Sequence, residues 1–316
     1  WEGLNEDLGA TAVWGSQQLG LFPGARYDGL FGIWYGKAPG VDRTGDVFKH
    51  ANAAGTSALG GVLAIIGDDH NCKSSTLPSQ SEFAMADAEI PVLNPASIQD
   101  VLDYGIHGWN MSRYSGAWTG LVALADTMDS GAVVNIDLDR FSFVAPSFHL
   151  PEAGVHMRRG DTPLDKEARL RHFKLPAAQA YVRANRLDHV ILPSPRPRIG
   201  VIVTGQAARD VFEALAAIGL TPEEAGRLGL AVYKVAMPWP LEPEGVREFC
   251  AGLERIVVIE HKRPLIEDQL KAALYDLPDA KRPVVEGKRT AQGTPLLSDV
   301  ASITIPEMAT ALMKII

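Results

Sequence analysis

Four polar stretches of the sequence carry residue types that could do chemistry. They combine carboxylates, hydroxyls, cationic groups and glycines, and in open α/β sheets ligands gather at loops of this kind. The stretches are LNED (4–7), YGKAPGVDRTGD (35–46), GDDHNCKSST (67–76) and YGIHGWNMSRYSGAW (104–118). Each also has an ordinary structural explanation: Asp7 can cap a helix, Gly36 and Gly40 can shape a turn, and Arg113 can be a solvated cation. The residues alone leave both explanations open.

The sequence lacks the common signatures of a nucleotide site and of a zinc site. No GxGxxG motif follows a predicted strand, since the turn at Gly205 has no later glycines, and no Walker phosphate loop occurs. His70 and Cys72 have no second ligand pair at zinc spacing. We therefore predict no metal site within this sequence.

A weaker pattern joins Asp68 and Asp69 to Asn94 and imitates the Gly-Asp-Gly…Asn motif that holds magnesium and a cofactor diphosphate in some enzymes. Asp69 stands where that motif has a glycine, and a glycine is what lets the backbone approach a phosphate closely. The pattern therefore favours an ordinary turn, with a diphosphate site as the alternative.

The elements that must position these stretches alternate between apolar runs and helix-length amphipathic segments, which is typical of parallel sheets covered by helices. In the first part, strands are predicted at 30–35, 61–66, 90–93 and 133–136, and helices at 5–19, 46–54, 97–104 and 117–128. In the second part, strands are predicted at 199–204, 231–235 and 255–260, and helices at 207–218, 243–253 and 265–273. The chain is therefore predicted to be α/β, with two parallel-sheet domains at 1–165 and 199–316 joined by a linker over 166–198.

Composition excludes several classes of function. A formal net charge of -8 with 22% charged residues gives no basic surface for nucleic acid or anionic lipid, and no apolar run reaches the ~18 residues of a transmembrane helix. The only two cysteines, Cys72 and Cys250, are too few for an iron–sulfur cluster, which needs about four thiolates. They also form no disulfide framework, so a cytoplasmic location is expected. The start at Trp1 suggests an excerpt of a longer chain.

The four stretches, in this order, resemble the indolepyruvate ferredoxin oxidoreductase family in its long bacterial form. The resemblance runs through DTPL (161–164), KLPAA (174–178), MPWPLEPEGV (237–246) and VVIEHKRPLIEDQL (257–270), and so covers essentially the whole chain. It implies a pyrimidine-binding domain of a thiamine-diphosphate enzyme over 1–165, with its N-terminal part missing. A domain like the transketolase C-terminal domain is implied over 199–316.

The resemblance also implies an activity, namely oxidative decarboxylation of aryl 2-oxoacids such as indolepyruvate to acyl-CoA, with ferredoxin as electron acceptor. The cofactor is thiamine diphosphate, and its Mg2+ and the iron–sulfur clusters are expected on domains absent from this sequence. The expected partners are those missing domains, ferredoxin, coenzyme A and a second copy in a homodimer. This chain alone is therefore expected to be inactive.

Within the family pattern, Glu6 matches the carboxylate that activates the cofactor through its pyrimidine ring. Its structural alternative is an acidic first-turn residue that complements the helix dipole. The resemblance further implies that Gly36, Pro39 and Gly40 lie along the cofactor ring. Substrate binding is implied for the loop residues Lys73, Ser74, Ser75 and Gln80. Two other functions stay open: a non-catalytic dimerisation or docking module, and a transketolase-like thiamine enzyme without iron–sulfur chemistry.

Overall fold

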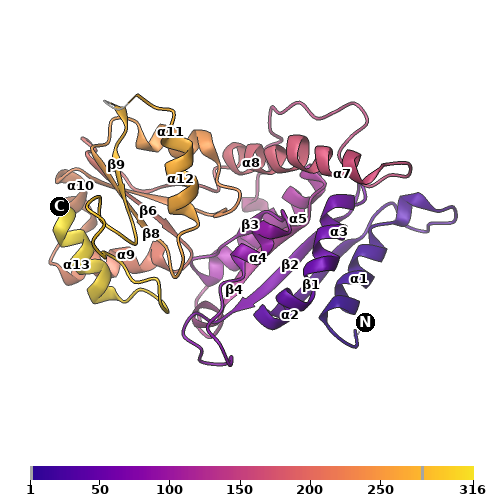
Figure 1. Ribbon diagram of the computed structural model, residues 1–316, viewed down its shortest axis with the longest axis horizontal. Helices are drawn as coiled ribbons and strands as arrows, with labels where there is room; N and C mark the ends of the chain where they lie inside the picture. The colour runs from indigo at the N-terminus through magenta and orange to yellow at the C-terminus, as the bar shows by residue number, and fades with distance from the viewer. Residues whose placement is uncertain (1–2, 279–280) are drawn as a thin grey trace. The chain divides into compact units, whose positions relative to one another are not determined.

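The computed structural model describes residues 3–278 and 281–316 (Figure 1). Contacts divide the chain into two compact units, which are described separately below. Unit 1 comprises residues 1–69 and 79–185, and unit 2 comprises residues 70–78 and 186–316. Each unit holds one sheet with helices around it, so the predicted α/β class with two parallel-dominated sheets is confirmed. No helix among the described residues is long and apolar enough to cross a membrane.

The sheet of unit 1 has the strand order β1-β2-β4-β3, and all of its neighbouring pairs are parallel. Its strands are β1 (Phe31–Lys37), β2 (Gly61–Asp68), β3 (Val92–Leu93) and β4 (Thr119–Leu124). β1 is an edge strand whose side chains alternate between exposed and more buried positions, whereas β2 and β4 are buried almost throughout. This difference follows from position, because a central strand of a parallel sheet is covered on both faces.

Helices cover both faces of this sheet. They are α1 (Glu6–Ser16), α2 (Ala38–Arg43), α3 (Gly45–Ala54), α4 (Glu82–Asp87), α5 (Ile98–Ser115), α6 (Ala125–Met128), α7 (Pro163–Arg169) and α8 (Leu175–Ala184). On one side, the core is an aromatic cluster in which Phe48 of α3 packs edge-on against Trp34 at 4.8 Å and against Trp118 at 6.1 Å between ring centroids. The cluster fastens α1 and α3 to the strands.

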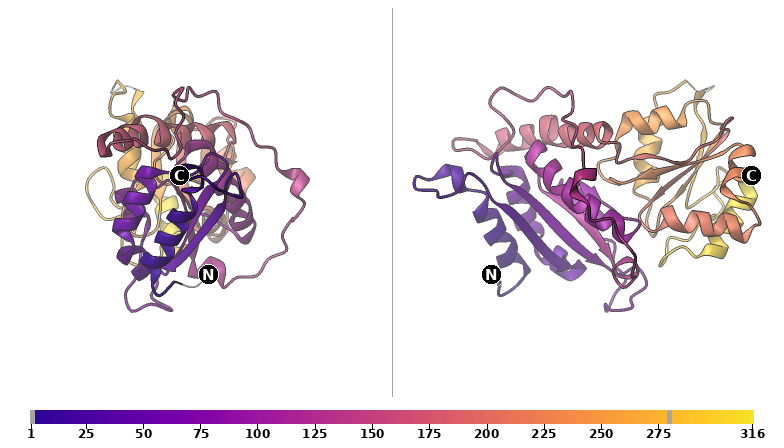
Figure 2. Two further views of the ribbon diagram at one scale, coloured as in Figure 1. Left: turned by 90° about the vertical axis from the view of Figure 1, so that its right-hand side faces the viewer. Right: turned by 180° about the vertical axis from the view of Figure 1, so that it is seen from behind.

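Two predicted elements of this region are wrong. The helix predicted at 117–128 is β4 followed by the single turn α6, because a short apolar run on a doubly covered strand looks the same as a buried helix segment. The strand predicted at 133–136 belongs to an irregular segment over 129–148, which contains one 3-10 turn (Leu138–Arg140) and pairs with no described strand (Figure 2). There the side-chain amide of Gln99 bonds both main-chain groups of Asn135, at 2.7 and 3.2 Å, in place of a neighbouring strand.

The stretch 104–118, predicted as a ligand loop, is mostly helix. It forms the C-terminal part of α5, which ends at Gly116 with φ +73°, a left-handed C-cap. Inside the helix, a Cβ at position 108 would stand 2.6 Å from Leu63 Cδ1 of β2, so a glycine at this position allows the helix to pack closely on the sheet. Gly108 therefore serves packing, and Gly116 serves helix termination.

Residues 166–198, predicted as a linker, contain regular structure. They include most of α7, a π-helical turn (Leu170–Lys174), α8 and strand β5 (His189–Leu192), and the boundary between the units falls after Asn185. α7 and α8 both belong to unit 1, where α7 contacts α3 and the amphipathic helix α8 packs on α5. The Pro- and Arg-rich sequence SPRPR (194–198) forms only the short connection between β5 and β6.

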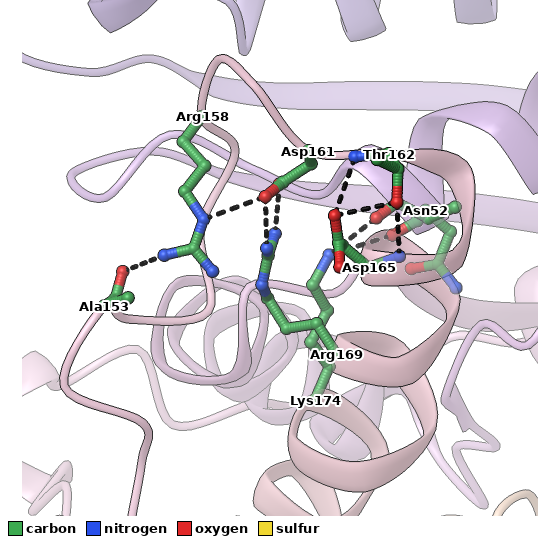
Figure 3. A network of polar contacts seen from close by, with 9 residues as sticks. Asn52, Ala153, Arg158, Asp161, Thr162, Asp165, Arg169 and Lys174 are labelled. Atoms are coloured by element: carbon green, nitrogen blue, oxygen red, sulfur yellow. Dashed lines mark hydrogen bonds and ion pairs between the residues drawn. The ribbon is translucent and has the colours of Figure 1, made fainter.

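A polar network holds the start of this helical segment on unit 1 (Figure 3). Asp161 accepts two hydrogen bonds from Arg169 at 2.5 and 2.6 Å and one from Arg158 at 3.2 Å. Lys174 is fully buried and donates to the carbonyls of Asn52 and Ala53 at the end of α3, at 3.2 and 3.1 Å. Burial lowers the pKa of Lys174 to about 7. The segment is thus anchored by charged groups with little exposure to water.

Unit 2 has the strand order β5-β7-β6-β8-β9, in which only β5 runs antiparallel to its neighbour. The other strands are β6 (Ile199–Thr204), β7 (Leu230–Val235), β8 (Arg255–Ile259) and β9 (Val284–Glu286). Its helices are α9 (Ala207–Ala217), α10 (Pro222–Arg227), α11 (Pro243–Cys250), α12 (Ile266–Leu274) and α13 (Ile305–Ile315). Every element predicted in this part is confirmed within a few residues, while β9, α10 and α13 were not predicted.

Candidate functional site

A groove of about 910 Å³ lies along α1 and β1 in unit 1. One side is formed by the first turns of α1, and the other by the outer strand β1. Besides glycines, the groove is lined by Leu4, Asn5, Glu6, Ala12, Val13, Ser16, Leu30, Phe31, Ile33, Trp34, Tyr35 and Arg43. The groove thus combines a carboxylate and a guanidinium with apolar and aromatic walls.

Glu6 stands at the start of α1 because the preceding residue is a good N-cap. The Asn5 side chain accepts a hydrogen bond from the Leu8 amide at 3.0 Å, which satisfies one of the free donors of the first turn. The Glu6 side chain is 39% exposed, and its Oε2 atom lies 3.5 Å from Nη1 of Arg43. The carboxylate therefore keeps access to the groove and has one cationic neighbour.

Two of the predicted cofactor-binding glycines lie against Glu6. A Cβ on Gly40 would stand 2.5 Å from Glu6 Cγ and 3.1 Å from Cδ and Oε1, and a Cβ on Gly36 would stand 3.6 Å from Glu6 Cγ. Neither glycine lines the groove. The absence of a side chain on Gly40 leaves room for Glu6, whereas a Cβ on Gly36 would make only an ordinary van der Waals contact with it. A role of both glycines along the cofactor ring stays a prediction.

The stretch 35–46, predicted as one glycine-rich loop, is instead the end of β1, the whole of α2 and the start of α3. Pro39 occupies an early position of α2, where a proline costs no hydrogen bond, and it does not line the groove. The helix α2 is hard to recognise from the sequence because it is short and contains a glycine, which usually weakens a helix.

The predicted substrate-binding residues are divided between the two units. Lys73, Ser74 and Ser75 belong to the segment 70–78 of unit 2, and Gln80 belongs to unit 1. Lys73 and Ser74 are exposed, and the Ser75 carbonyl accepts a contact from Cys72 Sγ at 2.6 Å. A substrate role for these four residues stays a prediction.

The pattern that imitates a diphosphate site has a structural use in unit 1. Asp68 accepts hydrogen bonds from the amide and the hydroxyl of Ser81 at 2.7 and 2.6 Å, just before α4 begins. Asn94 donates to Glu82 Oε1 at 3.2 Å. Both polar groups are buried and hold the segment 79–94 on the sheet, which supports the turn interpretation over the diphosphate alternative.

Arg43 and Trp34 line the groove, and no role was predicted for either of them. Arg43 lies inside the stretch 35–46, and only its positive charge, opposite to that of Glu6, could have suggested that the two side chains pair. Trp34 reads as an ordinary core residue of an alternating strand, and its 3% exposure agrees with that. Its indole Nε1, however, donates to the Glu6 carbonyl at 3.0 Å, a contact that no spacing rule predicts.

Comparison with known proteins gives matches over both units. Residues 189–316 match the family model of the indolepyruvate oxidoreductase domain. The indolepyruvate oxidoreductase subunit IorA of Methanothermobacter thermautotrophicus is 25% identical over 254 residues, covering 78% of this chain and 38% of the relative. IorA of Pyrococcus abyssi is 24% identical over 268 residues, covering 80% of this chain and 38% of the relative. The chain thus spans about two fifths of the length of these relatives.

Two solved structures share the fold at low sequence identity. The 2-oxoglutarate:ferredoxin oxidoreductase from Magnetococcus marinus, solved with 2-oxoglutarate, coenzyme A and succinyl-CoA bound, is 14% identical with a TM-score of 0.60, covering 99% of this chain and 56% of that chain. An inactive β4 tetramer of a split-gene transketolase is 11% identical with a TM-score of 0.51, covering 96% of this chain and 79% of that chain. The order of the two units along the chain is therefore one found in enzymes of these types.

Proposed function

Because this chain is a member of the indolepyruvate oxidoreductase family, we propose that it is the part of a 2-oxoacid:ferredoxin oxidoreductase that provides the pyrimidine side of a thiamine diphosphate site. The observation that carries the proposal is the placement of Glu6. Its carboxylate opens into the groove of unit 1, and Gly40 gives its side chain room. An acid whose only task is to complement a helix dipole needs neither feature.

The groove suits an aminopyrimidine ring. Such a ring is flat and apolar on its faces and has nitrogen atoms at its edge, so it needs aromatic or aliphatic walls and one well-placed carboxylate. The carboxylate is that of Glu6, and the apolar surface on the same side of β1 is formed by Val13 and Trp34. The side chains of Phe31, Ile33 and Tyr35, which are 53%, 44% and 79% exposed, alternate with Trp34 along the strand and so lie on its other face. When bound, thiamine diphosphate supplies the nucleophilic carbon and the electron sink for removing carbon dioxide from a 2-oxoacid.

Within this site, Glu6 holds the proton that it shares with a ring nitrogen, and Arg43 fixes the direction of the carboxylate. The Arg43 contact is long and both side chains are substantially exposed, so its electrostatic contribution is modest. The residues that bind magnesium and the diphosphate lie, in this proposal, on parts of the enzyme outside this sequence, as do the iron–sulfur clusters.

The finer assignments are also proposals. We infer an aryl 2-oxoacid such as indolepyruvate as substrate, coenzyme A and ferredoxin as co-reactants, and a cytoplasmic homodimer as the working form. Substrate contacts are assigned to Lys73, Ser74, Ser75 and Gln80. Support comes from the names of the relatives and from the type of reaction that the fold serves elsewhere.

One observation favours a second function, a docking module. The exposed apolar side chains of Phe31, Ile33 and Tyr35 share one face of an edge strand, and a contiguous apolar face of this kind often marks an interaction site. If docking were the only function, the charge of Glu6 would be dispensable. The two functions are therefore distinguished by substitutions at Glu6.

The proposal predicts weak cofactor binding by this chain alone. Calorimetry of the 316-residue chain with thiamine diphosphate, with and without magnesium, should give no micromolar binding, since only the pyrimidine side of the site is provided. The complete polypeptide should bind the cofactor and reduce a viologen dye with indolepyruvate and coenzyme A. Magnesium-dependent micromolar binding by the chain alone would contradict the proposal and bring Asp68 and Asn94 back as metal-site residues.

A substitution at Gly40 should displace Glu6 without harming the fold. In Gly40→Ala the new methyl group collides with the Glu6 side chain, while alanine favours the helix α2 by up to about 1 kcal/mol. Turnover of the complete enzyme should fall on the order of 10- to 100-fold, as for a misplaced catalytic group, with an unchanged or higher melting temperature. Gly15→Ala is the control, because nothing lies within 4 Å of its Cβ position. Equal turnover in the two variants would show that the Glu6 position is unimportant.

A further inference from the structure

Trp34 makes a contact with Glu6 that ordinary core packing does not require. The indole Nε1 of Trp34 donates a hydrogen bond to the main-chain carbonyl of Glu6 at 3.0 Å. Glu6 is the first residue of α1, and the first turn of a helix is where it frays most easily. The bond therefore ties the least constrained turn of α1 to strand β1.

The indole itself has little freedom to move. Trp34 is 3% exposed, its strand is paired with β2 at Ala64, and its ring packs edge-on against Phe48. A Cβ on Gly36 would stand 2.8 and 2.9 Å from the outer ring carbons of Trp34, so Gly36 leaves space for the ring. The ring is thus a rigid support fixed on three sides.

The other tryptophans of this core show that an indole N–H need not have a partner here. Trp118 is fully buried, packs against the same Phe48 ring, and its Nε1 has no hydrogen-bond partner in the described structure. Trp14 on α1 likewise has a buried Nε1 without a described partner. Among these three indoles, only that of Trp34 has its N–H directed at the residue that carries the proposed chemistry.

We propose that Trp34 is a positioning residue for Glu6: its N–H fixes the first turn of α1, and thereby the direction from which the Glu6 carboxylate enters the groove. This inference rests on the proposed function. Placing a reacting group within a fraction of an ångström is worth large factors in rate, and groups held by a rigid neighbour are placed best.

The test is Trp34→Phe in the complete enzyme, with Trp118→Phe as the matched loss of a buried indole. Trp34→Phe should lower turnover on the order of 10-fold or more, with an unchanged KM for the 2-oxoacid. Exchange of the cofactor C2 proton should slow by the same factor. Replacing Trp34 by 3-benzothienylalanine, which keeps the ring size and exchanges N–H for sulfur, should have the same effect, and it keeps the test valid if the phenylalanine variant folds poorly.

A second readout needs no cofactor. Hydrogen exchange of the 316-residue chain should speed up over residues 3–10 in both Trp34 variants and not in Trp118→Phe. The inference is overturned if the two Trp34 variants lose no more turnover than Trp118→Phe, or if KM rises while turnover is kept. Unaffected turnover in Glu6→Gln would instead overturn the proposed function, whatever the Trp34 variants do.

Discussion

Replacing Glu6 by glutamine should lower the turnover of the complete enzyme by on the order of 10²- to 10⁴-fold, the range for a lost acid–base group. The amide keeps the size of the side chain but cannot take up or release the proton that a carboxylate shares with a ring nitrogen. Since Glu6 is partly exposed, the free energy of unfolding should change little. The measurements are viologen reduction with indolepyruvate and exchange of the cofactor C2 proton followed by NMR.

Asp7→Asn is the control for the helix-dipole alternative. Asp7 is the second acid of the same first turn, and it does not line the groove. Both substitutions remove one favourable charge from the N-terminus of α1, which is worth about 0.3–1 kcal/mol. If the asparagine variant loses as much turnover as Glu6→Gln, the charge of the helix turn is what matters and Glu6 has no special role.

Asp161→Asn should destabilise unit 1 by about 3 kcal/mol, the lower end of the range for breaking a buried ion pair. The Asp161 and Arg169 side chains are 11% and 6% exposed, so the substitution leaves the Arg169 guanidinium with little water and no carboxylate. Asp87→Asn is the control: its partner is Lys49, and the two side chains are 71% and 53% exposed. It should change stability by less than about 1 kcal/mol.

The effect of Asp161 should depend on pH in a defined direction. Hydrogen bonds from Arg169 hold the pKa of the Asp161 carboxyl below its usual range, although desolvation opposes them. A carboxyl with a depressed folded-state pKa stabilises the fold above its unfolded pKa of about 3.9 and loses this effect as the pH falls through the folded pKa. The difference in unfolding free energy between wild type and Asp161→Asn should therefore be full at neutral pH and shrink below about pH 4.

Urea unfolding followed by tryptophan fluorescence can measure this difference, since Trp14, Trp34, Trp109 and Trp118 all belong to unit 1. A difference that stays constant from pH 7 to pH 3 would mean that the lost packing of the side chain, rather than its charge, explains the destabilisation.

The sequence predicted most of the fold where hydrophobic periodicity was unambiguous. In unit 2, buried strands alternate with amphipathic helices, and each predicted element appears. In unit 1 the pattern misled at β4, where a doubly buried strand has no alternation, and at 133–136, where strand-like composition is held by a side-chain amide instead of a strand. Neither case can be resolved from local sequence, because the deciding contacts come from α5 and from the sheet.

The family resemblance is confirmed, and of the proposed site residues, the structure brings together Glu6, Gly36 and Gly40. The close approach of Gly40 to Glu6 could not be predicted, because it depends on where α2 places that glycine. The role of Trp34 could not be predicted either, since a buried tryptophan in a strand normally serves only to fill the hydrophobic core. The role of a residue that acts through another residue depends on their contact in three dimensions, and spacing along the chain does not reveal that contact.

Side chains of α5 and of the residue that follows α8 hold the irregular segment over 129–148 in the described structure. The amide of Gln99 bonds Asn135, the amide of Asn185 bonds Val144 at 2.9 and 3.0 Å, and Asp103 pairs with Arg140. Residues gained or lost between these anchors would shift no strand out of register, and loop length affects stability only weakly. Over evolutionary time, insertions and deletions in this unit should therefore accumulate in this segment, and a short peptide tag placed there should leave the sheet and the groove intact.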